Sequence, residues 1–149
     1  MDASKRISDL IIISKRLAEL LIQENTALRD HRTGDVQALI NEKDETSRVY
    51  ESRIVGLSEH ATDEDIAEVD EILMDQLRFL SKEIQALSEE NAMRLQVAME
   101  ANRRVLHEVT EAVKANTPGP GTYSNSGVVS KGPSQAAPGN IPISLDKLL

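Results

Sequence analysis

The sequence predicts an all-α protein: an elongated antiparallel helical bundle or coiled-coil hairpin, followed by a flexible C-terminal tail. Three observations support this prediction. Apolar residues recur every three or four positions across residues 1–115, which is the helical period. All five prolines and five of the seven glycines lie beyond Asn116. The chain has no cysteine or tryptophan and only 2% aromatic residues, so any core must be aliphatic.

The first helix is expected over about residues 3–31. His31 and Arg32 suit a last helical turn, Gly34 a position just after a helix, and Asp35 the N-cap of the next helix. The second helix is expected over about residues 36–57 and should end at Gly56 and the polar residues that follow it.

The third helix is expected over residues 63–115, with Thr62–Asp65 as a capped, acidic start. Its apolar positions follow steps of three and four, and no glycine or proline occurs between residues 57 and 117. The apolar seam turns polar at Ser88–Asn91, where a break is the alternative. The first two helices either lie end to end along the third, with a kink at Gly34, or fold back at Gly34 into a three-helix bundle.

Charge and composition exclude several classes of function. The net charge is −8, and the first 115 residues contain 15 basic and 24 acidic residues. Because the chain is acidic and contains no run of basic residues, the sequence argues against nucleic-acid binding. No apolar run approaches the roughly 20 residues of a membrane span, so we expect a cytoplasmic protein without membrane insertion. The three histidines are far apart, and no catalytic or metal-binding motif is present. We therefore expect no enzyme, no metal and no cofactor.

Residues 116–149 are predicted to be a flexible, Pro/Gly-rich tail with two islands of distinct composition. One runs from Tyr123 to Gly127. The other, residues 141–149, contains five aliphatic side chains: Ile141, Ile143, Leu145, Leu148 and Leu149. This second island either docks on its own bundle or serves as a short binding motif for a partner.

The seam of the third helix becomes thin after Asn91, where small and polar residues occupy its positions. This composition indicates a weaker core or a surface kept for a partner. The candidate binding residues there are Leu95, Val105 and Val109, alongside the aliphatic residues of the 141–149 island.

The order of several motifs resembles the FlgN family of flagellar type III export chaperones. The residues concerned are Leu20–Leu28 with Gly34-Asp35, Leu39 and Lys43, then Asn91 and Asn102–Leu106, and finally Thr122-Tyr123 with Gly127. The resemblance implies a cytoplasmic chaperone that binds the C-terminal helical segments of hook-associated proteins (FlgK and FlgL). It further implies delivery of these clients to the export gate protein FlhA, with Tyr123 and Gly127 at the gate contact.

A self-associating coiled-coil adaptor is the alternative function. In that case a second copy of the chain would cover the apolar seam, giving a homodimer.

Overall fold

The computed structural model describes residues 2–116, and within this range the protein is helical without strands. The helices are α1 (Ala3–Arg29), α2 (Thr33–His60), α3 (Asp63–Ala67) and α4 (Glu71–Ala115). The described residues fall into two units, 2–95 and 96–116, and α4 contributes to both. The prediction of an all-α fold is confirmed.

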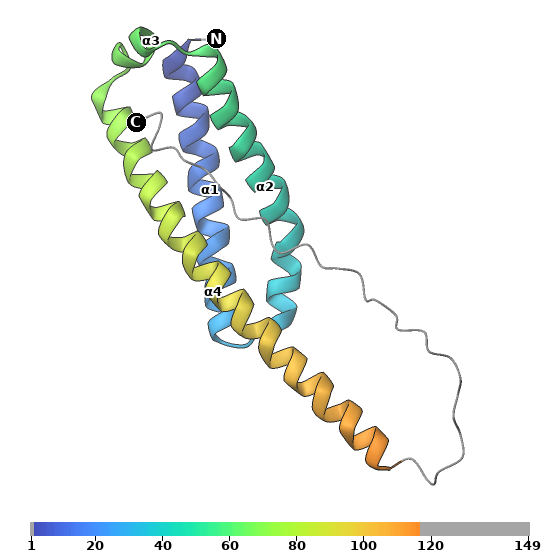
Figure 1. Cartoon of the computed structure of the whole chain (residues 1–149). Helices are drawn as coiled ribbons and strands as arrows, with labels where there is room; N and C mark the ends of the chain where they lie inside the picture. The colour runs from blue at the N-terminus through green and yellow to red at the C-terminus, as the bar shows by residue number, and fades with distance from the viewer. Residues whose placement is uncertain (1, 117–149) are drawn as a thin grey trace. The chain divides into compact units, whose positions relative to one another are not determined.

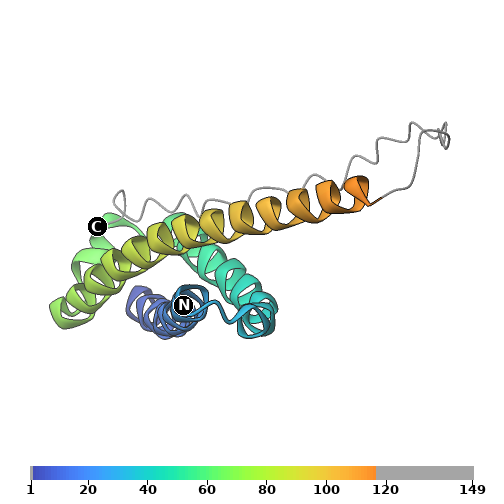
Figure 2. The ribbon, with the colours of Figure 1, turned by 90° about the horizontal axis from the view of Figure 1, so that it is seen from below.

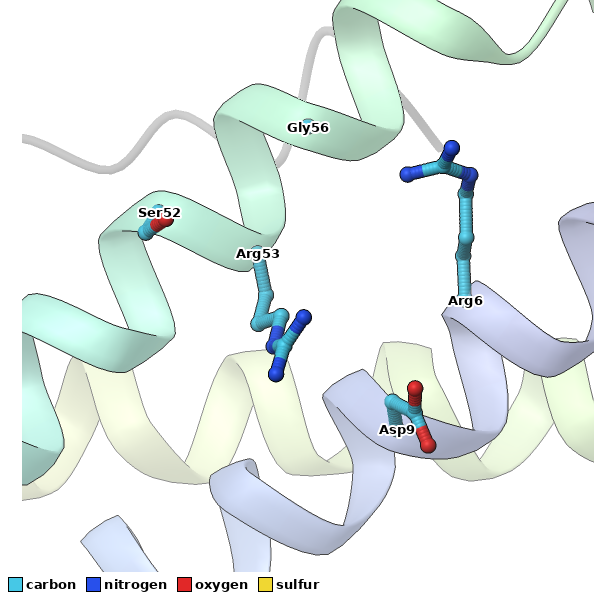
Figure 3. A pocket seen from close by; sticks show the side chains of 5 residues that line it. All are labelled: Arg6, Asp9, Ser52, Arg53 and Gly56. Atoms are coloured by element: carbon cyan, nitrogen blue, oxygen red, sulfur yellow. The ribbon is translucent and has the colours of Figure 1, made fainter. Parts of the chain in front are cut away.

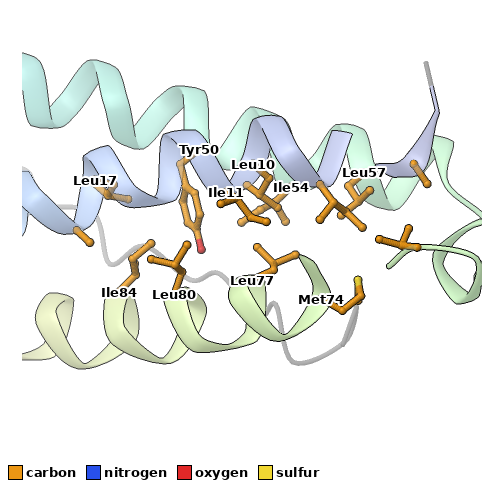
Figure 4. Close-up of a cluster of buried hydrophobic side chains, with 14 of the residues drawn as sticks. Leu10, Ile11, Leu17, Tyr50, Ile54, Leu57, Met74, Leu77, Leu80 and Ile84 are labelled. Atoms are coloured by element: carbon orange, nitrogen blue, oxygen red, sulfur yellow. The ribbon is translucent and has the colours of Figure 1, made fainter. Parts of the chain in front are cut away.

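Residues 2–95 form a three-helix bundle in which α2 runs antiparallel to α1 and α4 (Figure 1). The view in Figure 2 shows α1 and α2 on the same side of this part of α4. Aliphatic side chains from all three helices meet in one core, and Tyr50 points from α2 toward α4 among them (Figure 4). Its main members are Ile7, Leu10, Leu17, Leu21, Tyr50, Ile54, Leu57, Met74, Leu77, Leu80 and Ile84. The expected aliphatic core is therefore present.

The turn between α1 and α2 lies earlier than predicted, because His31 adopts the left-handed conformation with φ 57°. The amide of His31 donates to the carbonyl of Leu28 at 3.3 Å, and that of Arg32 donates to the carbonyl of Ala27 at 2.8 Å. These two bonds form a Schellman motif, which usually has glycine in the left-handed position. The prediction that Gly34 follows the helix and Asp35 caps the next one is therefore wrong. Both residues lie in the first turn of α2.

The chain folds back at this turn, so α1 and α2 lie side by side in the bundle (Figure 1). The end-to-end arrangement with a kink at Gly34 is wrong. The predicted end of the second helix at residue 57 is also too early, since α2 continues through Gly56 to His60. Glycine inside a helix costs about 1 kcal/mol relative to alanine. Burial of Leu57, which is 3% exposed, offsets that cost.

The predicted helix over residues 63–115 is interrupted at Glu68–Asp70, so it is not continuous. The predicted start is confirmed. Thr62 and Asp65 form a capping box, in which the Asp65 carboxylate accepts from the Thr62 amide at 2.9 Å. A second cap lies eight residues later, because Oδ1 of Asp70 accepts from the Ile72 amide at 2.7 Å. The intervening Val69 turns into the core, where it is 7% exposed.

Helix α4 passes through Ser88–Asn91 without a break, so the alternative of an interruption there is also wrong. Asn91, the last residue of this polar run, instead takes part in hydrogen bonds with polar side chains of α1 and α2. Nζ of Lys43 lies 2.8 Å from Oε2 of Glu24, and it donates to Oδ1 of Asn91 at 3.4 Å. Asn91 in turn donates to Oδ1 of Asn25 at 3.0 Å, and Asn25 donates to the carbonyl of Leu87 at 3.1 Å.

We call Glu24, Asn25, Lys43 and Asn91 the polar layer. Glu24, Asn25 and Asn91 are buried, and Lys43 is mostly buried. Buried polar groups are tolerated when they are hydrogen-bonded, and here each member has a partner from another helix. The layer therefore joins α1, α2 and α4 at the end of the bundle where the aliphatic core stops.

Candidate helix-binding site

The second unit presents apolar side chains on one face of α4. These side chains belong to Ala98, Met99, Val105, Leu106, Val109 and Ala112. Because an α-helix has about 3.6 residues per turn, the six residues form one stripe along the helix, which we call the exposed stripe. Ala98 is half-buried, and the other five members are exposed, with Val105 at 59% and Leu106 at 67%. An exposed face of this kind is typical of a surface that binds another helix.

Local ion pairs contribute to the helical state of this segment. The carboxylate of Glu100 accepts from Arg103 at 2.8 Å and from Arg104 at 3.2 Å, one turn further along. Glu111 lies 3.6 Å from Nζ of Lys114 in the same way. Pairs at these spacings stabilise a helix, and the segment contains no glycine or proline.

The charges of this segment cancel. Residues 96–116 contain three acidic and three basic side chains. Hydrogen bonds from Arg103 and then Arg104 lower the pKa of Glu100 to about 2. Five of the six charged side chains of residues 96–116 are therefore paired within their own helix, and the segment carries no net charge.

The candidate binding residues within the described range fall on one helix face. Val105 is 59% exposed and Val109 is 54% exposed, and both belong to the exposed stripe. Leu95 is half-buried in the last described turn of the bundle unit. The other candidates lie outside the described residues. These are Tyr123 and Gly127 for the export gate, and Ile141, Ile143, Leu145, Leu148 and Leu149 for client binding or self-docking.

Met99 and Leu106 were missed by the reasoning from sequence. Each directly follows a seam residue, Ala98 or Val105, and a search for one apolar residue at each step passes over the second. The signal that would have identified them is the number of apolar positions in each heptad. Apolar residues at positions a, d and e, and not at a and d alone, are typical of a broad face that packs in a core.

A small polar pocket lies between α1 and α2 near Gly56 (Figure 3). Arg6, Asp9, Ser52, Arg53 and Gly56 line it. A Cβ atom on Gly56 would lie 3.8 Å from Nη1 of Arg6, which is ordinary contact. These five residues contain no pairing of a nucleophile with a general base, so we assign the pocket no chemistry.

The histidines are separated in the structure as in the sequence. His31 occupies the turn after α1, His60 ends α2, and His107 is exposed on α4. Within residues 2–116, no group of three or more His, Cys, Asp or Glu side chains could hold a metal ion. None of the described helices has the length and apolarity needed to cross a membrane.

Comparisons with known proteins add no family. No protein-family model matches the chain. Searches of curated proteins and of solved structures likewise found no match.

Proposed function

We propose that this protein is a cytoplasmic flagellar export chaperone of the FlgN type. In this role it binds hook-associated proteins of the FlgK and FlgL type through their C-terminal helical segments and delivers them to the export gate protein FlhA. The observation that carries the proposal is the exposed stripe, a face of apolar side chains on a helical segment, residues 96–116, whose acidic and basic side chains are equal in number.

The physical logic of such a chaperone is burial of apolar surface. An amphipathic client helix that is left bare self-associates through its apolar face. Covering several hundred Å² of that face, at about 25 cal/mol per Å², gives several kcal/mol before the costs of ordering are subtracted. A complex of this strength protects the client and still releases it.

Co-purification of the full chain with the hook-associated proteins of its own organism tests the proposal. We expect the wild-type chain to retain a hook-associated protein and the V105E/V109E double variant to lose it. Phe79→Glu is the matched control, since Phe79 is 62% exposed on α4 but lies away from the exposed stripe. Failure of the wild-type chain to retain any hook-associated protein would contradict the proposal.

The role proposed for the C-terminal region is tested separately. Tyr123→Ala is expected to weaken co-purification with FlhA and to leave client binding unchanged. A chain ending at Asn116 distinguishes client capture by the exposed stripe from capture by residues 141–149. Client retention by this shortened chain assigns the binding to the helices, and loss of retention assigns it to the removed segment.

A self-associating adaptor is the second candidate. The internal pairing of charges on residues 96–116 favours it, because two copies of this segment would not repel each other. Sedimentation over a range of protein concentrations tests this candidate. A strict monomer at high concentration would exclude it.

A further inference from the structure

The face of α4 that carries the exposed stripe has a counterpart within the bundle. An α-helix presents the same face again after about 18 residues, which is five turns of about 3.6 residues. Each position of the exposed stripe therefore corresponds to a position 18 residues earlier in α4. The structure shows what covers those earlier positions.

The seven earlier positions are all buried or half-buried, and they are Leu80, Ser81, Ile84, Leu87, Ser88, Asn91 and Arg94. Both α1 and α2 cover these positions. Asn91, for example, donates to Asn25 of α1 and accepts from Lys43 of α2. Leu80 and Ile84 likewise belong to a core that contains residues of both α1 and α2 (Figure 4).

The seven later positions carry a more apolar face than the covered one. They are Ala98, Met99, Asn102, Val105, Leu106, Val109 and Ala112. Six of these seven are apolar, whereas only Leu80, Ile84 and Leu87 are apolar among the covered seven. All but Ala98 are exposed. The later face is thus the more apolar of the two, yet most of it is not buried by any described residue.

The width of this face decides what kind of partner fits it. A two-stranded coiled coil uses a narrow seam at heptad positions a and d, whereas a helix packed in a bundle also uses e or g. The exposed stripe has the broader form, with Met99 and Leu106 each adding the third position. A single partner helix would leave one edge of the stripe in water.

We propose that the exposed stripe binds two helices of one client side by side, as α1 and α2 together cover the earlier turns of α4. The matching surface on the client is a pair of amphipathic helices with aliphatic faces. This inference rests on the proposed chaperone function and specifies its substrate as a two-helix surface. Glu100 pairs with Arg103 and Arg104 within α4, so the inference requires no charged group on the client.

Single cysteines test the inference, because the chain has none of its own. Met99→Cys and Ala112→Cys place a thiol at opposite edges of the exposed stripe, and Val109→Cys places one at its centre. His107→Cys, on the back of the same helix, is the matched control. The measurement is the rate of maleimide labelling of each full-length variant, alone and with a purified hook-associated protein.

We expect the client to slow labelling at both edges and at the centre by about tenfold when present at about ten times its Kd. Labelling of the His107→Cys thiol should not change. Protection of the centre and one edge only, in a complex that forms, would overturn the two-helix inference and leave the chaperone function standing. Absence of a complex would overturn both. Protection that grows with protein concentration without client would assign the face to a second copy and also overturn the inference.

Discussion

Two stretches of α4, residues 80–94 and 98–112, present the same helix face in opposite circumstances. The first stretch is covered by α1 and α2 although it carries two serines, an asparagine and an arginine at its inward positions. The second is exposed although six of its seven corresponding positions are apolar. Apolar composition alone therefore does not tell which part of a long helix is core. Burial depends on which partner helices reach it.

The polar layer shows how the first stretch tolerates its composition. A buried carboxylate is costly unless it is paired, and Glu24, at 1% exposed, is paired with Lys43. The Asn91 amide donates to the side-chain oxygen of Asn25, and the Asn25 amide donates to the carbonyl of Leu87. These bonds require particular partners at particular positions, and they give this end of the bundle a defined register that aliphatic contacts alone do not impose.

The largest expected effect comes from truncating one leucine in the covered part of α4, just before residues 80–94, and one in the exposed stretch. Leu77 is 1% exposed, so Leu77→Ala should lower the free energy of unfolding by about 3 kcal/mol, through lost burial and the cavity left behind. Leu106→Ala removes the same atoms from a side chain that is 67% exposed, and its effect should stay within about 0.5 kcal/mol. Chemical denaturation of both variants measures the difference.

The same pair of variants separates folding from binding. Leu106→Ala should weaken client retention while keeping wild-type stability. A large loss of stability in Leu106→Ala would mean that another part of the chain buries this face in solution, and it would remove the contrast between the two stretches.

A smaller effect is expected from breaking the polar layer. Lys43→Met leaves the Glu24 carboxylate buried without its cation, which should cost about 2 kcal/mol, less than for a fully buried pair because Lys43 retains some exposure. Adding Glu24→Gln to that variant should recover much of the loss, since a neutral amide is cheaper to bury. Thermal unfolding of the single and double variants checks this. Equal stability of the single and double variants would show that the Glu24 carboxylate is not costly to bury without Lys43.

The fold class could be predicted from the sequence because helical periodicity and the placement of proline and glycine are local signals. Thr62 and Asp65 were found for the same reason, since a capping box is contained within four residues. The core was found only in outline. Assigning Leu80 to the core and Val105 to the surface requires knowing where α1 and α2 end, which is a tertiary property.

The wrong boundaries have identifiable causes. Gly34 and Gly56 were expected to end helices, but His31 takes the left-handed turn position and burial of Leu57 keeps α2 going past Gly56. The interruption at Glu68–Asp70 carries neither glycine nor proline. Its signal was Asp70 as a second N-cap, which is easily overlooked within an acidic run.

The covered part of the molecule should also respond to alkaline pH through Tyr50. Burial raises the pKa of this phenol from 10.0 to about 12. The folded state therefore holds the phenol proton more tightly than the unfolded state, and stability falls as the pH rises from 10 toward 12. Between pH 10 and pH 11, linkage lowers the free energy of unfolding by about 1 kcal/mol.

Tyr50→Phe isolates this contribution. Stability measured by denaturation should fall less steeply between pH 10 and 12 in the variant than in wild type. Identical slopes for the two proteins would mean that the Tyr50 ring reaches water in solution, against its place in the core.

The smallest effect concerns the exposed stretch, where Glu100 is the titratable group with the clearest perturbation. Hydrogen bonds from Arg103 and Arg104 lower the pKa of its carboxyl from 4.5 to about 2. The carboxylate should therefore remain ionised at pH 3, with the pairing complete above about pH 4.5 and lost as the pH falls through 2. Carboxyl carbon shifts in NMR measure this titration, and the R103Q/R104Q double variant should restore an ordinary pKa.

Titration of Glu100 near 4.5 in the wild-type chain would show that Arg103 and Arg104 are available to a client. The two outcomes predict different salt dependence for the complex. Charges that pair within α4 leave the apolar stripe as the main source of affinity, so raising the salt from about 50 to about 300 mM should change the Kd little. Charges left unpaired would instead steer an acidic client, and its affinity would fall over the same range. The pKa of one exposed carboxyl thus distinguishes a proposed client that would be recognised by its shape and apolarity from one that would be recognised by its charge.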